Sequence, residues 1–132
     1  MQISMMDKHN SIVEPEDTVW HLGDFYLGDN WKEIQTILSK LNGKHHLVIG
    51  NHDWLYVWNY IEAGFLSVHT SFQLDGYNLV HDPAVAGVIK EQKWIHGHTH
   101  GLGLRLNENT YCVCVELHDY CPVDFDHIKS VF

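Results

Sequence analysis

The sequence predicts a single α/β domain over residues 1–132, in which two β-sheets form a sandwich flanked by helices. Helices and strands alternate through the first half of the chain, which is typical of parallel sheets. Two hairpins are expected in the second half. The length suits one domain, and a content of 45% hydrophobic residues can supply its core.

The first half of the chain is expected to alternate helix and strand. Residues 1–13 indicate only the last turns of a helix, and Pro15 disfavours helix at Glu14. Apolar runs predict strands, whereas apolar residues at helical spacing predict helices. The expected order is a strand at 18–22, a helix at 31–41, a strand at 45–49 and a helix at 54–63. Alternating aromatic residues leave a strand as an alternative for the last of these.

The second half is expected to form hairpins and a final helix. Strands at 66–74 and 77–80 flank Asp75-Gly76, a dipeptide that favours a tight hairpin turn. A short strand is predicted at 94–96. A second hairpin joins strands at 102–106 and 110–117. The last helix covers 124–131, with Asp124 as its N-cap.

Composition limits the class of protein. A formal net charge of −9 repels phosphate backbones, so binding to nucleic acid is not expected. No apolar run reaches the roughly 20 residues of a membrane span, and the N-terminus lacks a signal-peptide pattern. Three cysteines, an odd number, argue against a disulfide framework. We therefore expect a cytoplasmic protein without a membrane partner.

Polar motifs directly follow three of the predicted strands. They are Gly23-Asp24, Gly50-Asn51-His52-Asp53 and Gly97-His98-Thr99-His100. Open α/β sheets carry their chemistry at the carboxyl ends of strands, so these side chains are expected at one rim. Carboxylate, amide and imidazole groups bind divalent metals, and imidazole also moves protons. The pattern predicts a two-metal phosphoesterase site.

Each residue taken alone has a simpler interpretation. Asp24 and Asn51 would more often cap turns, and His81 before Asp82-Pro83 would more often be an exposed turn residue. Five further histidines are assigned to structure or surface: His21, His45, His46, His69 and His96.

Together, the motifs and their order resemble those of the calcineurin-like metallophosphoesterase family. Val80-His81 supplies the family's intervening histidine, and residues 13–24 and 41–49 are similar to the corresponding segments of small phage and bacterial members. The resemblance implies a metallophosphoesterase-like β-sandwich. It also implies two divalent metal ions, drawn from Mn²⁺, Fe, Ni²⁺ and Zn²⁺, and a phosphomonoester or phosphodiester substrate.

The resemblance also assigns roles to the residues of the motifs. Asp24 would bridge the two metals, because one anion must lie between two cations. Asn51, His81 and His98 would complete one metal's ligands, and His100 would bind the other metal. His52 would be the catalytic proton donor to the leaving group, oriented by Asp53.

One motif of the family has no satisfactory counterpart here. Asp7-Lys8-His9 matches the family's first motif, Asp-x-His, which ends an N-terminal strand. Only residues 10–17 separate it from the strand at 18, whereas a parallel crossover needs a dozen or more. On a helix, residues two apart do not share a face. We therefore expect the N-terminal strand to be missing and the second metal site to retain only Asp24 and His100.

The missing strand has two consequences. It would leave an open sheet edge beside the strand at 18–22, and a homodimer or a partner chain is expected to cover it. It also keeps a second function open, that of a catalytically impaired metal- or nucleotide-binding partner or regulatory protein. A third reading is a single-site zinc hydrolase or zinc-binding module. This third reading is weaker, because its candidate ligands lack the spacing of a structural zinc knuckle; they are Cys112, Cys114, Cys121 and His118. The acidic charge favours a small phosphorylated substrate, such as a nucleotide.

Overall fold

The computed structural model describes residues 3–22, 31–49, 57–82, 92–97, 108–114, 118 and 121–132. Across these segments, two sheets and four helices form a mixed α/β fold, which confirms the predicted class. None of the helices described is long and apolar enough to span a bilayer.

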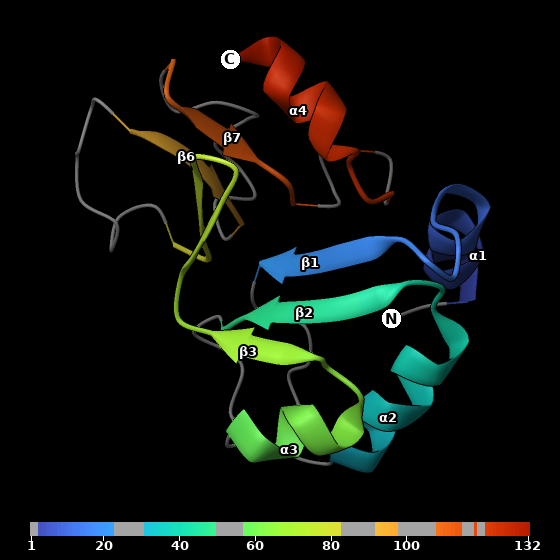
Figure 1. The fold of residues 1–132 in the computed structure, drawn as a ribbon. Coiled ribbons are helices and arrows are strands. Elements are labelled where there is room, and N and C mark those ends of the chain that lie inside the picture. The colour runs from blue at the N-terminus through green and yellow to red at the C-terminus, as the bar shows by residue number, and fades with distance from the viewer. Residues whose placement is uncertain are drawn as a thin grey trace.

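The first sheet is parallel and comes from the first half of the chain. β1 (Thr18–Leu22), β2 (Lys44–Val48) and β3 (Ser67–His69) lie in the order β1-β2-β3. α2 (Trp31–Lys40) and α3 (Val57–Ala63) pack on one face of it (Figure 1). The contact buries an apolar cluster made by Ile34, Leu38, Leu47, Tyr60, Ala63 and Phe65. From Val57 onward, the helical prediction is confirmed and the strand alternative is wrong.

The helical turns predicted within residues 1–13 are confirmed as α1 (Ile3–Ile12), which lies near the amino ends of β1 and β2 (Figure 1). Its polar side chains bind the end of α2. The Nε2–H of His9 donates to the Asn42 carbonyl at 2.8 Å. The Asn10 amide donates to the Lys40 carbonyl at 2.8 Å, and its oxygen accepts the Asn42 N–H at 2.8 Å. These bonds satisfy backbone groups that a helix terminus leaves without partners.

The second sheet contains β4 (Phe72–Leu74), β5 (Tyr77–Val80), β6 (Lys93–His96) and β7 (Thr110–Cys112), in that order. β4 and β5 are antiparallel, whereas the β5–β6 and β6–β7 pairs are parallel. The predicted hairpin turn is confirmed. Asp75 has φ 52° and Gly76 has φ 83°, as a type I′ turn requires.

The single strand predicted at 66–74 is wrong. Its first part is β3, which pairs with β2, and its second part is β4, which pairs with β5 in the other sheet. The chain crosses between the sheets after β3 (Figure 1). The strand predicted at 110–117 is also too long, because β7 ends at Cys112. Its predicted partner at 102–106 lies outside the described residues.

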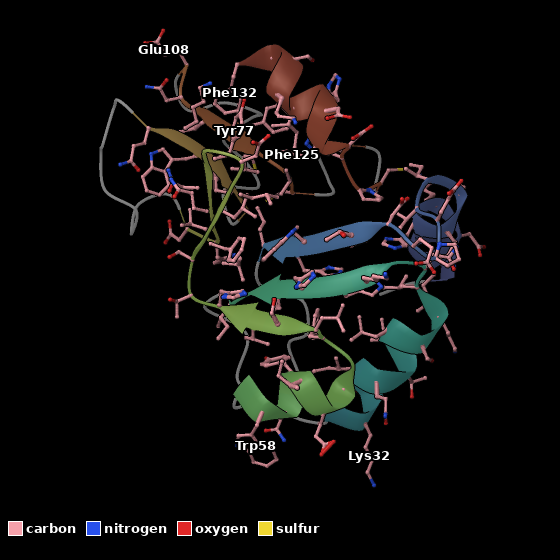
Figure 2. The ribbon with its side chains drawn as sticks, viewed as in Figure 1. Lys32, Trp58, Tyr77, Glu108, Phe125 and Phe132 are labelled. Carbon is pink, nitrogen blue, oxygen red and sulfur yellow. The ribbon has the colours of Figure 1, made fainter. Side chains whose placement is uncertain are left out.

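A second apolar cluster joins the two sheets. Leu22 and Val48 of the first sheet pack in one core with residues of β5, β6, β7 and α4, namely Tyr77, Leu79, Ile95, Tyr111 and Ile128. The predicted final helix is confirmed as α4 (Phe125–Val131), and the Asp124 side chain caps it by accepting the Asp126 N–H at 3.0 Å. Phe125 and Phe132 hold α4 against Tyr77, with ring centroids 5.4 and 5.2 Å away (Figure 2).

Candidate functional site

Strand ends from both sheets meet at Leu22, His81 and Gly97. Leu22 ends β1, His81 follows β5 and Gly97 follows β6. A ring nitrogen of His81 lies 2.8 Å from the Leu22 carbonyl oxygen. The Gly97 N–H donates to the His81 carbonyl at 3.1 Å. The carboxyl ends of strands from the two sheets are therefore joined directly.

His81 is buried at this junction, with 6% of its surface exposed, so the exposed-turn interpretation is wrong. Its Nδ1 faces a carbonyl oxygen, which can only accept a hydrogen bond. Nδ1 therefore carries a hydrogen, and in the neutral ring Nε2 is the nitrogen with the lone pair. Metal-binding histidines usually donate the other ring N–H to a carboxylate, a carbonyl or water in this way. His81 thus has the tautomer that a metal ligand needs.

Gly97 is required by the closeness of the strand ends. A Cβ atom at this position would lie 2.9 Å from the Leu22 carbonyl oxygen and 3.6 Å from His81 Nδ1. The first distance is shorter than real Cβ contacts, so a side chain would push the two sheets apart. Neither Gly97 nor the Leu22 carbonyl was predicted to have a role of its own. The signal in the sequence is their position, because Leu22 directly precedes the motif Gly23-Asp24 and Gly97 begins the motif Gly97-His98-Thr99-His100.

Six predicted site residues lie outside the described part of the chain: Asp24, Asn51, His52, Asp53, His98 and His100. The described residues that flank these positions in the sequence do lie close to one another. Leu22, two positions before Asp24, pairs with Val48 in the parallel β1–β2 ladder. The Ile49 N–H, just beyond Val48, donates to the His69 carbonyl at 2.8 Å. Gly97 directly precedes His98.

His21 of β1 and His45 of β2 form a hydrogen-bonded pair on the face of the first sheet that the helices cover. His45 Nε2–H donates to the Leu41 carbonyl at 3.2 Å, so His45 Nδ1 must be an acceptor. His21 Nε2 lies 2.9 Å from that Nδ1 and therefore carries the hydrogen between the two rings. Burial, then the neighbouring His45, holds the pKa of His21 well below its usual value. Burial also lowers the pKa of His45, against an opposing effect of the Leu41 carbonyl.

Neither of two other possible ligand groups is assembled. Asp7 is exposed on α1 whereas His9 is buried, so these two side chains do not act together. His118 Nε2 bonds the Cys112 carbonyl at 2.8 Å rather than joining a cysteine cluster. Within the segments that the structure describes, no three His, Cys, Asp or Glu side chains gather as a metal site.

Comparison with known proteins identifies a fold. No family model matches the chain, and no curated protein does so either. A crystal structure of a protein of unknown function, AQ665 from Aquifex aeolicus, is similar with a TM-score of 0.70 and 24% sequence identity. The match covers 98% of this chain and 84% of that chain. At this identity the likeness concerns the fold alone, and this chain shares its fold with a protein whose activity is unknown.

Proposed function

We propose that the chain is a metal-dependent phosphoesterase of metallophosphoesterase-like sandwich fold, acting on a phosphomonoester or phosphodiester. The observation that carries the proposal is the hydrogen bond from His81 Nδ1–H to the Leu22 carbonyl. It gives His81 the tautomer of a metal ligand, at the point where β1, β5 and β6 end.

Chain connectivity supports the ligand set. The described residues that flank these positions in the sequence lie together, since Leu22 pairs with Val48 and Gly97 bonds His81. Asp24, Asn51, His81 and His98 would hold one metal, and His100 would bind a second one bridged by Asp24. When bound, the metals would generate a nucleophile from water and offset phosphoryl charge.

His52 has the remaining chemical role in this proposal. It would donate a proton to the leaving alkoxide, with Asp53 orienting its ring. A small substrate, such as a nucleotide, suits the net charge of −9 better than a long nucleic acid does.

One observation favours the alternative of a catalytically impaired, metal- or nucleotide-binding partner protein. Asp7 and His9 lie on a helix, and His9 is engaged with the Asn42 carbonyl. They therefore add no ligands to the proposed second metal, which would keep only Asp24 and His100. Among the strands described, β1 is also an edge strand of the first sheet. We propose that a second copy of the chain covers this edge.

Hydrolysis of an aryl phosphate with added Mn²⁺ tests the proposal. His52→Ala should lower kcat by roughly 10²–10⁴-fold, because proton donation to the leaving group is lost. His81→Gln should weaken Mn²⁺ binding, and His127→Ala on the exposed side of α4 is the matched control.

The outcomes separate the two readings. Mn²⁺ binding that depends on His81 without any hydrolysis would favour the impaired partner protein. Hydrolysis that needs no metal, or that survives His52→Ala unchanged, would contradict the proposed enzyme.

A further inference from the structure

A second group of histidines lies on the opposite face of the first sheet from the pair His21 and His45. His46 of β2 is paired with Ser67 of β3, and His69 follows two residues later on the same face. His46 Nδ1 is 2.5 Å from Ser67 Oγ, and His69 Nε2 is 2.9 Å from the same oxygen. Two imidazole nitrogens from neighbouring strands thus converge on one small group.

The hydrogen bonding limits which nitrogens of this group carry a proton. The Ser67 hydroxyl has one hydrogen, so it can donate to only one of the two imidazole nitrogens, and the other nitrogen donates its N–H to the hydroxyl oxygen. Burial, then the nearby His69, lowers the pKa of His46, which keeps its ring neutral near pH 7.

Aromatic side chains form the walls around the two rings. The ring of Trp20 stacks on His46 at a centroid distance of 4.7 Å. The ring centroid of Phe72 lies 4.7 Å from that of His69 and 4.5 Å from that of Trp20. These contacts restrict the rotation of both imidazoles, while both rings remain only half-buried and can be reached from solvent.

Imidazole nitrogens that converge in this way suit a particular class of ligand. Zn²⁺, Ni²⁺ and Cu²⁺ prefer imidazole nitrogen, with bonds of about 2.0–2.1 Å for zinc. A cation can take the place of the Ser67 hydroxyl between the two nitrogens if the hydroxyl turns away and the ring that donates to it moves that proton to its other nitrogen. The acidic chain, with a net charge of −9, also favours cation binding.

We propose that His46, Ser67 and His69 form a binding site for a divalent transition metal, with His46 Nδ1 and His69 Nε2 as its ligands. The site draws on none of the residues of the proposed phosphoesterase centre. Two protein nitrogens leave the other positions to water, so binding is weaker than at a closed four-ligand zinc site.

Nitrogen NMR of the histidine rings, during Zn²⁺ titration of the full chain, tests the proposal. His46 Nδ1 and His69 Nε2 should shift together, in the wild type and in an Asn51→Ala background that weakens the proposed phosphoesterase centre. His69→Gln should abolish the response of His46 and lower zinc affinity at this site more than tenfold. His127→Gln, exposed on α4, should leave both unchanged.

Each other outcome is decisive. Unchanged His46 and His69 resonances when Zn²⁺ has saturated His81 would overturn this site and leave the phosphoesterase centre standing. A joint shift of His46 and His69 in a protein that hydrolyses no phosphate ester would support this site and count against the enzyme. Equal zinc affinity in His69→Gln and His127→Gln would also overturn it.

Discussion

Acidification should destabilise the protein through the buried histidine pair. His45 can accept from His21 only while its Nδ1 is unprotonated, because its Nε2–H is already bound to Leu41. Protonation of His45 therefore removes the hydrogen bond and sets two N–H groups against each other. Protonation of His21 places a charge among His45, His9 and the apolar ring of Phe65.

The sign follows from the lowered pKa values. A histidine whose pKa is lower in the folded state takes up its proton first in the unfolded chain, near its ordinary value of about 6.5. Its contribution is complete above that pH and is lost as the pH falls below it. For His21, whose pKa is well below the usual value, the loss between pH 7.5 and 5.5 is on the order of 1 kcal/mol. His45 adds a smaller loss in the same direction.

Urea unfolding at the two pH values, in EDTA, measures this effect. His21→Gln retains a side-chain amide that can donate to His45, but it cannot be protonated. The variant should therefore lose on the order of 1 kcal/mol less than the wild type between pH 7.5 and 5.5. His127→Gln, an exposed control, should lose as much as the wild type. Equal losses in His21→Gln and His127→Gln would refute the reasoning.

Three further predictions follow from other parts of the fold. Gly97→Ala should lower the free energy of unfolding by about 1–3 kcal/mol, since its Cβ would meet the Leu22 carbonyl at 2.9 Å. Urea unfolding measures this loss, and Gly76→Asn, at a turn with open space around it, is the control. Asp124→Ala should cost about 1 kcal/mol by uncapping α4, and Asp124→Asn should restore most of it in the same assay. Light scattering should detect a homodimer, and a stable monomer at high concentration would contradict the proposal that a second copy of the chain covers the β1 edge.

Local elements could be predicted from the sequence because their causes are local. The apolar stripe of α2, the Asp75-Gly76 turn and the Asp124 cap each depend on a few adjacent residues. The break between β3 and β4 had no such local cause. A strand that leaves one sheet and enters another keeps its alternation, so the choice of partner strand depends on tertiary packing.

The candidate site shows the same difference between features with local causes and features that depend on long-range contacts. The motifs predict which residues bind metal, and these roles stay predictions. The contact that fixes the tautomer of His81 joins residues 59 positions apart, which no local pattern reveals. His45 and His46 show a similar limit. Strand alternation places neighbours on opposite faces, but it does not say that one binds His21 and the other Ser67.

The bond between His81 and Leu22 also bears on the order of folding. Closing a loop of 59 positions costs more chain entropy than forming the hairpin at Asp75-Gly76. Contacts of such long range are expected to form after local ones. Each sheet can therefore gain pairing before the junction at Leu22, His81 and Gly97 closes. A ligand that binds across this junction would stabilise the docking of the two halves of the chain, rather than either half alone.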